Sequence, residues 1–553
     1  MRTILFLLCL SLVAPVRMAG AGEGLVADSL AVDSLVADFD YLVESLEATH
    51  PDPYSGFGGK VFFHKKANEV RNSLRTRPCA TTEDFRERAM AFLSNLGDSH
   101  TTLSDLSPSL EAGRIVPIDL KCVSDGLIVR ALPVGHKALL GSRLLGMNGL
   151  GMEELLAFVS RHDACENRYD QYYRLALRAR TGPFAGPLFA GGTDTVAFDL
   201  LTPRQERVTL RLPLVDAPGR GRALAGIASL PDTTTIPGGH LSYGFLDDAG
   251  QVMYIRVKTI NARDNFEYMY RNGWDFYSQL AYYYRNYMDR ELPADTLAAI
   301  RELPSFTTVF ADMLRAMKAR KAPTLIIDLR GNSGGFTPII QPTLYQLFGD
   351  RYLRTDMGTD YYQLISPLYL RKINMSLEAY NERYQTSYTL GDYTFGDDEG
   401  QDGETPVEAA RQSFVEGSMS SDKAGLRALG GQPLYTPDHV YVLTDCETFS
   451  AAFHYAFYLW KMGATVVGIP SRQAPNTYME QTPFELPYTR VKGSISNAIQ
   501  IFLPAGDKRS RIFYPDLIPS YDDYRKYHFD QQSELLFLLD RVKRGEHPSP
   551  AGI

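Results

Sequence analysis

Several features are scarce in this chain of 553 residues, and each scarcity excludes a class of protein. Positive charge is not in excess, since 57 Lys and Arg stand against 65 Asp and Glu for a net charge of −8. A nucleic-acid-binding protein carries a basic face, which this balance argues against. The five cysteines are far apart and lack the spacing of a metal site. We therefore expect no nucleic acid, no metal ion and no organic cofactor.

Long apolar runs are also lacking. No stretch reaches the roughly 20 apolar residues that a membrane-spanning helix needs, so no stable membrane insertion is expected. Residues 1–23 have the pattern of a secretory signal, with Arg2 at its start, an apolar stretch from Ile4 to Val16 and the small residues Ala19 to Ala21. The pattern predicts export to the periplasm or the extracellular space. Disulfides are permitted there, but the sequence does not reveal how Cys79, Cys122, Cys165 and Cys446 pair.

The length of the chain predicts several domains. After the signal, residues 24–110 show the apolar spacing of helices. Residues 111–216 contain short β-like runs, and residues 217–239 are rich in Pro, Gly and Thr, as in a linker. Residues 240–553 alternate apolar runs with helical stretches, which predicts an α/β domain. Within that domain, we interpret residues 350–432 as an insertion over one edge of the sheet.

The β-like region has a recognisable order of elements. Gly126 to Ala131 and Asp194 to Leu200 are strand candidates on either side of the turn at Asn148 and Gly149, and Met152 to Val159 forms a helical stretch. This order resembles a PDZ-type domain, which binds peptide ends by adding a strand to its sheet. A spacer without a ligand groove is an equally good interpretation.

Ser450 occupies the most informative position of the α/β region. An apolar run from Val440 to Leu443 predicts a buried strand, and Ser450 to Met462 has the composition of a packed helix. A serine at a strand-to-helix junction lies near unpaired amide groups and the positive end of the helix dipole. Such a serine suits nucleophilic catalysis, although many serines there only cap a helix.

Two further segments carry candidate chemistry. The strand candidate from Pro323 to Asp328 leads into a turn with Gly331, Gly334 and Gly335, whose amides could bind an oxyanion. No lysine follows these glycines, so the turn does not match a phosphate-binding P-loop. His100 comes after a helical stretch and is a candidate general base, although the chain has ten histidines.

Together these segments resemble the tail-specific, or C-terminal processing, serine peptidases. The resemblance rests on Asp328 to Gly335, on Glu447 to Ala452 with Ser450 as nucleophile, and on the strand from Thr465 to Gly468. It implies a crotonase-like (ClpP/crotonase-type) α/β catalytic core behind a PDZ-like domain. It also implies an oxyanion hole drawn from Gly331, Gly334, Gly335 and Ala451, in which we favour Gly331.

One branch of that family uses a lysine base about two dozen residues after the serine. Here the window from Ser471 to Glu480 contains no lysine, and Arg472 cannot deprotonate. The chain is more similar to the branch of the tricorn protease core, in which a histidine far upstream takes the proton. That resemblance assigns His100 as base and Ser99 to the relay. For the relay acid it leaves Glu480, Asp507 and Asp516 open, and we favour Asp516.

We therefore predict an exported serine peptidase that cleaves peptides or unfolded proteins through an acyl-enzyme at Ser450. The alternative is a catalytically inactive protein on the same fold that binds peptides or apolar ligands. A hydrolase of small acyl compounds would use the same triad, and a homo-oligomer is compatible with the sequence.

Overall fold

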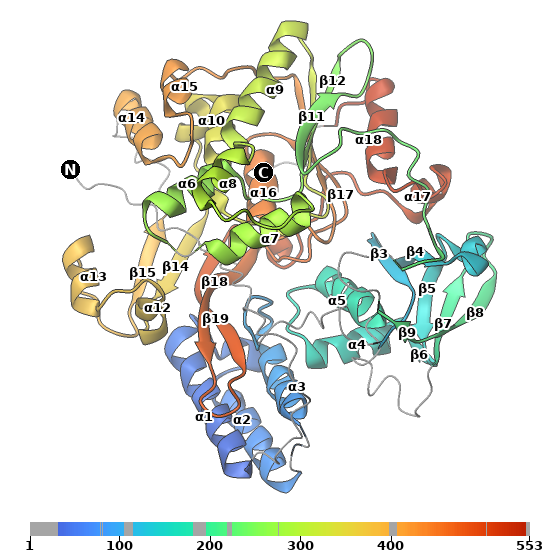
Figure 1. Ribbon diagram of the computed structural model, residues 1–553, viewed down its shortest axis with the longest axis vertical. Coiled ribbons are helices and arrows are strands. Elements are labelled where there is room, and N and C mark those ends of the chain that lie inside the picture. The colour runs from blue at the N-terminus through green and yellow to red at the C-terminus, as the bar shows by residue number, and fades with distance from the viewer. Residues whose placement is uncertain are drawn as a thin grey trace.

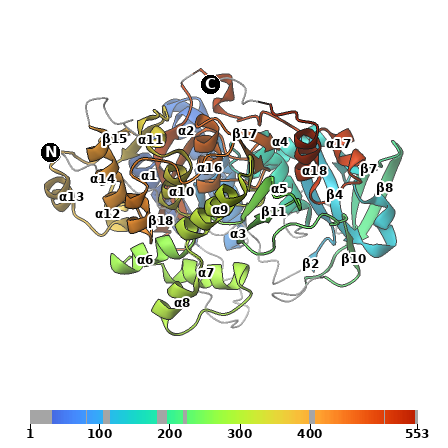
Figure 2. The ribbon, with the colours of Figure 1, turned by 90° about the horizontal axis from the view of Figure 1, so that it is seen from above.

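The computed structural model describes residues 31–77, 79, 81–103, 114–180, 195–217, 224–274, 276–397, 406–504 and 506–548. The predicted signal lies outside these residues. Within them, no helix is both long and apolar enough to cross a membrane. Figure 1 shows a helical region and a β-rich unit beside a larger α/β core. In both Figure 1 and Figure 2, the β-rich unit and helices α12 to α14 lie at opposite ends of the molecule.

A mostly parallel sheet forms the centre of the α/β core, in the order β11-β12-β13-β16-β17. Strands β12, β13, β16 and β17 run parallel, and β11 pairs antiparallel with β12. The predicted strands before the glycine turn and before Ser450 are therefore neighbours, as the α/β interpretation requires. The bounds are β11 Leu241–Phe245, β12 Val252–Val257, β13 Thr324–Asp328, β16 His439–Thr444 and β17 Thr465–Gly468.

Both faces of this sheet are buried, because successive side chains of a strand point to opposite faces. On β13, Leu325 and Ile327 pack into the large core with helices α9, α10 and α16, whereas Ile326 packs with Leu535 and Leu538 of α18 on the other face. Figure 1 shows α18 on the opposite side of the sheet from α9 and α10. Outside the interval 350–432, the described α-helices that follow β12 are α6 Arg263–Arg271, α7 Tyr277–Tyr287, α8 Thr296–Glu302, α9 Phe306–Arg320, α10 Gln341–Phe348, α16 Ala451–Lys461, α17 Tyr521–Lys526 and α18 Ser533–Lys543.

The interval 350–432 contributes to a second sheet. Its strands β14 and β15 pair with each other, and β14 pairs with β19, so this segment is structured and joins the core. The described elements are α11 Asp350–Arg354, β14 Asp360–Leu364, α12 Pro367–Lys372, α13 Leu377–Tyr384, β15 Tyr393–Asp397, α14 Val407–Gly417 and α15 Lys423–Ala428.

A long hairpin connects the core to the N-terminal helices. Strands β18 (Asn476–Glu485) and β19 (Lys492–Ile501) pair along their length. At the tip of the hairpin, Phe484, Leu486 and Val491 pack into the same apolar cluster as the N-terminal helices (Figure 1). The predicted helical region consists of α1 Val32–Thr49, α2 Lys60–Thr76, α3 Thr82–Leu93 and the short strand β1 Thr102–Leu103.

The β-rich unit, defined here as the described residues of 114–230, forms a sheet in the order β10-β4-β5-β7-β8. Strand β10 pairs with β4 although it lies inside the predicted linker, 217–239. The linker is therefore shorter than predicted, because Ile227 to Ser229 extend this sheet. The bounds are β2 Arg114–Ile115, β3 Asp119–Val123, β4 Gly126–Pro133, β5 Arg143–Met147, β6 Leu150–Gly151, α4 Met152–His162, α5 Arg168–Arg180, β7 Thr195–Leu201, β8 Arg207–Pro213, β9 Val215–Asp216 and β10 Ile227–Ser229.

Candidate active site

Ser450 lies directly before the first residue of α16, in a backbone conformation that non-glycine residues rarely adopt. Its φ is 53° and its ψ is −128°, and 4% of the residue is exposed. Such conformations cost free energy and cluster at functional sites. The Ser450 N–H donates to Oε1 of Gln473 at 2.5 Å, which fixes the turn. Gln473 comes from the window, Ser471 to Glu480, in which the serine–lysine branch is expected to have its base.

The glycine turn after β13 packs directly on Ser450. Gly334 has a φ of 105°, and a Cβ on it would lie 2.7 Å from the Cβ of Ser450 and 3.0 Å from the Ala451 nitrogen. The first distance is shorter than real Cβ contacts show and the second is tighter than most of them, so only glycine fits without moving Ser450. The sequence therefore brings two motifs, distant along the chain, into van der Waals contact.

His100 follows α3 in a loop that the hairpin holds in place. Its carbonyl oxygen accepts hydrogen bonds from Gln481 Nε2 at 3.0 Å and from Ser494 Oγ at 3.1 Å. The next residues, Thr102 and Leu103, pair with β19. The His100 ring stacks on Phe449, the residue before Ser450, with ring centroids 4.8 Å apart. Hairpin and stacking thus bring His100 next to the nucleophile segment.

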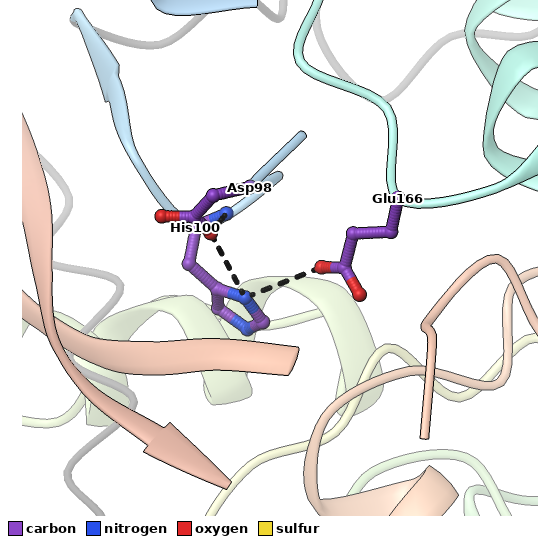
Figure 3. Close-up of side chains that lie close together, drawn as sticks. All are labelled: Asp98, His100 and Glu166. Atoms are coloured by element: carbon purple, nitrogen blue, oxygen red, sulfur yellow. Dashed lines mark hydrogen bonds and ion pairs between the residues drawn. The ribbon is translucent and has the colours of Figure 1, made fainter. Parts of the chain in front are cut away.

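Two buried carboxylates face Nδ1 of His100. This nitrogen lies 3.6 Å from Glu166 Oε1 and 3.9 Å from Asp98 Oδ1 (Figure 3). Glu166 comes from the loop between α4 and α5 of the β-rich unit. Ser99 Oγ donates to Oε1 of Glu166 at 2.5 Å, so the predicted relay serine also bonds to this acid.

In both Asp98 and Glu166, one carboxylate oxygen accepts two hydrogen bonds and the other oxygen faces His100. In Asp98, Oδ2 accepts from His50 and Thr101, and Oδ1 accepts only the His100 backbone N–H. In Glu166, Oε2 accepts from the Ala474 N–H and the Thr477 hydroxyl. Each carboxylate therefore has one oxygen held by two donors while the other faces the imidazole.

Asp98 stays ionised in its buried position. Burial alone raises the pKa of a carboxyl group, but the hydrogen bond and charge of His50, with the charge of His100, lower the pKa of Asp98 to about 2. His50 Nδ1 accepts the Asp52 N–H at 3.1 Å, and its Nε2 lies 3.3 Å from Asp98 Oδ2. This arrangement fixes the carboxylate behind His100.

Several polar atoms around Ser450 are buried without a hydrogen bond. In the described residues these include both ring nitrogens of His100, Nε2 of His454 and Nε2 of Gln473. Native proteins leave few such groups, and those that remain call for an explanation such as catalysis or a bound molecule. His454 lies one turn beyond Ser450. Burial, together with the nearby charge of His100, lowers its pKa to about 3, so it is neutral at physiological pH.

The three acids predicted as relay members lie in other environments. Asp516 Oδ2 accepts the Val466 N–H of β17 at 2.8 Å. Glu480 forms a buried ion pair with Lys372 at 2.8 Å, and Asp507 pairs with Arg509. The acids that lie beside His100 are Glu166 and Asp98, and not the preferred Asp516. The sequence around Glu166 carries no motif, and only its place in the fold reveals it.

The predicted oxyanion-hole residues also differ in what their amides do. The Gly331 N–H donates to both oxygens of Asp445 at 3.0 Å, and the Gly334 N–H donates to Asn332. These amides are occupied, which corrects the preference for Gly331. Ala451 is the first residue of α16, where an amide has no intrahelical acceptor. Gly335, the last glycine of the turn after β13, forms an isolated parallel β-bridge with Ile260.

Part of this chain matches a known protein family, and its fold is similar to that of solved structures. The profile described as "Peptidase family S41" matches residues 297–490. No curated protein shows a significant match. The structure of mature CPAF has a TM-score of 0.52 and 14% identity, covering 92% of this chain and 98% of that one. A CPAF mutant has a TM-score of 0.53 and 13% identity, covering 95% and 99%. The photosystem II D1 C-terminal processing protease has 14% identity and a TM-score of 0.37, covering 88% and 94%.

Proposed function

Because this chain belongs to peptidase family S41 through residues 297–490, and is thus a serine peptidase, we propose that it acts through a Ser–His–Glu triad. Ser450 is the nucleophile, His100 is the general base, and Glu166 orients the imidazole. The observation that carries the proposal is the position of His100, stacked on Phe449 beside Ser450 with Glu166 Oε1 3.6 Å from its Nδ1.

The chemistry follows from the tautomer of His100. With the two carboxylates on the Nδ1 side, the Nδ1–H form is favoured and Nε2 has a free lone pair. Nε2 takes the proton of the Ser450 hydroxyl as the oxygen attacks the peptide carbonyl, and then gives that proton to the leaving amine. A water molecule hydrolyses the acyl-enzyme in the same way. Glu166 and Asp98 stabilise the imidazolium that forms in each transition state.

The developing oxyanion needs amide donors on the opposite side of the carbonyl. Support for Ala451 comes from its place at the N-terminus of α16, where the N–H groups point outward and the helix dipole favours negative charge. Gly335 is the second donor in this proposal. Removal of one such donor typically costs about 3 kcal/mol of transition-state stabilisation.

The substrate is a peptide or an unfolded protein, as the peptidase family implies. Export follows from the signal-like sequence of residues 1–23. We infer that the β-rich unit is PDZ-like, and its part in catalysis is to supply Glu166. It also holds a cavity of about 370 Å³. Its lining includes Gly146, Leu150, Asp199, Leu200, Arg207 and Thr209.

Fluorophosphonate labelling of the purified mature protein tests this triad. We expect wild type to be labelled and to digest an unfolded protein substrate, while Ser450→Ala and His100→Ala do neither. The Asp507→Asn variant is the matched control, because the hydrogen bonds and ion pair of the Asp507 carboxylate in the described part of the chain go to Arg509 in its own turn. Absence of label and of digestion in folded wild type would favour the alternative, an inactive binding protein.

A further inference from the structure

The cluster behind the imidazole has the composition of a metal site as well as that of a catalytic relay. Asp98, His100 and Glu166 each offer one ligand atom, and these three atoms lie within 4.8 Å of one another. All three residues are buried, with exposed fractions of 0%, 5% and 3%. Figure 3 shows both carboxylates directed at the same ring nitrogen. We propose that these residues bind a divalent transition-metal ion of the zinc type, and that this ion inhibits the peptidase.

The two carboxylate oxygens already lie near the distance from Nδ1 of His100 that a shared zinc ion requires. Two ligand atoms bound to zinc in a tetrahedral arrangement at about 2.1 Å lie about 3.4 Å apart. The observed separations from Nδ1 of His100 are 3.6 Å to Glu166 and 3.9 Å to Asp98. The separations from Nδ1 are thus within about 0.5 Å of the value for a bound ion, and the two carboxylate oxygens lie within 4.8 Å of each other. One nitrogen with two carboxylate oxygens is a common donor set for zinc.

Each of the three ligand atoms can supply a lone pair to a metal ion. Nδ1 of His100 has no hydrogen bond within the described residues. Oδ1 of Asp98 and Oε1 of Glu166 each accept one hydrogen bond, and a carboxylate oxygen has a second lone pair for a metal.

The remaining oxygens are held by further donors. His50 and Thr101 bind Oδ2 of Asp98, and Ala474 and Thr477 bind Oε2 of Glu166. Metal sites depend on such supporting bonds, which orient the ligands and raise affinity. The same bonds therefore support both a relay and an ion site.

Inhibition follows from the single proton of a neutral imidazole, if His100 is the base that we propose. An ion on Nδ1 uses its lone pair, so the ring proton moves to Nε2. Nε2 then donates and cannot accept the proton of Ser450. The ion also replaces the contact between the imidazole and Glu166 that stabilises the charged ring.

Calorimetric titration of zinc into the metal-free, tag-free Ser450→Ala protein tests binding apart from activity. We expect one zinc ion per chain and no binding of magnesium, which prefers an octahedral shell of oxygens. Glu166→Gln and His100→Gln, each in the Ser450→Ala background, should weaken zinc binding at least about tenfold. His547→Ala is the matched control, since His439 and His547 stack 3.7 Å apart and offer a rival site. This variant should leave the affinity and the stoichiometry of zinc binding unchanged.

The same zinc concentration should abolish fluorophosphonate labelling of wild type, and EDTA should restore it. The proposal is overturned if Ser450→Ala binds no zinc, if both ligand variants bind it unchanged, if His547→Ala removes binding, or if bound zinc leaves labelling intact. Zinc binding to a metal-free wild type that never labels would instead count against the proposed triad and leave the ion site in place.

Discussion

Glu166 of the β-rich unit lies 3.6 Å from His100 of the N-terminal region. The two residues reach each other because the loop between α4 and α5 packs against the segment after α3. Glu166 is held there by Thr477 and the Ala474 N–H. The candidate active site is thus assembled from three separate parts of the chain, with Ser450 supplied by the α/β core.

Replacement of Glu166 by glutamine tests this relationship. The amide keeps the size of the side chain but loses the charge that favours the imidazolium, so we expect kcat to fall about 10²- to 10⁴-fold with a small change in KM. The measurement is peptide hydrolysis beside Asp516→Asn, whose remaining carbonyl can still accept the Val466 N–H. Equal losses in both variants would contradict the assignment of Glu166.

Gly334→Ala is expected to inactivate the protein by displacing Ser450. The new Cβ would lie 2.7 Å from the Ser450 Cβ and 2.8 Å from the carbonyl oxygen of Phe449. A shift of about 1 Å at a reacting atom can cost about a hundredfold in rate, so fluorophosphonate labelling should fall by at least that factor.

Gly391→Ala separates this effect from backbone strain. Gly391 also has a positive φ, 94°, but a Cβ there meets nothing within 4 Å. Gly391→Ala should lose about 1 kcal/mol of stability from backbone strain alone, Gly334→Ala should lose at least as much, and only Gly334→Ala should lose labelling. A fully active Gly334→Ala protein would mean that the turn yields instead of the nucleophile.

His454 should make the protein less stable in mild acid. Its folded pKa is about 3, below the ordinary 6.5, because burial and then the charge of His100 oppose protonation. Between these values the unfolded chain binds a proton that the folded chain does not, so stability falls as pH decreases from about 6.5 to 3. From pH 7.5 to 5 the contribution is about 2 kcal/mol.

The test is urea unfolding of Ser450→Ala and of Ser450→Ala with His454→Phe, at pH 7.5 and pH 5. The Ser450→Ala background prevents self-digestion. The phenylalanine variant should lose about 2 kcal/mol less stability between the two pH values. Parallel losses in the two proteins would show that His454 is not the group responsible.

The thiols should react slowly in the folded protein. The four described cysteines are free. A hydrogen bond with Cys122 and burial raise the pKa of Cys446, and burial raises that of Cys165. The thiolate is the reactive form, so iodoacetamide at pH 8 should modify Cys165 and Cys446 only after unfolding. Rapid labelling of the native protein, located by mass spectrometry, would contradict this burial.

The sequence predicted the parts of the site that lie on regular elements. Strands β13 and β16, helix α16 and the position of Ser450 follow from apolar runs that end in polar turns. His100 was one candidate base among ten histidines, and the family resemblance singled it out. Glu166 could not be predicted, because Cys165, Glu166 and Asn167 form an ordinary loop whose role depends on packing between units. The sequence did not reveal that the Gly331 N–H already has an acceptor. That acceptor, Asp445, reaches Gly331 because β13 pairs with β16.

In the proposed triad, Glu166 couples the position of the β-rich unit to the reactivity of Ser450, so that the two form one thermodynamic system. A ligand that moves the loop between α4 and α5 toward His100 must increase the population of competent triads, and one that moves it away must decrease that population. Binding energies are reciprocal between two linked sites. A molecule that binds reversibly at the Ser450 site must therefore change the affinity of the β-rich unit for such a ligand by the same factor as that ligand changes the affinity of the Ser450 site.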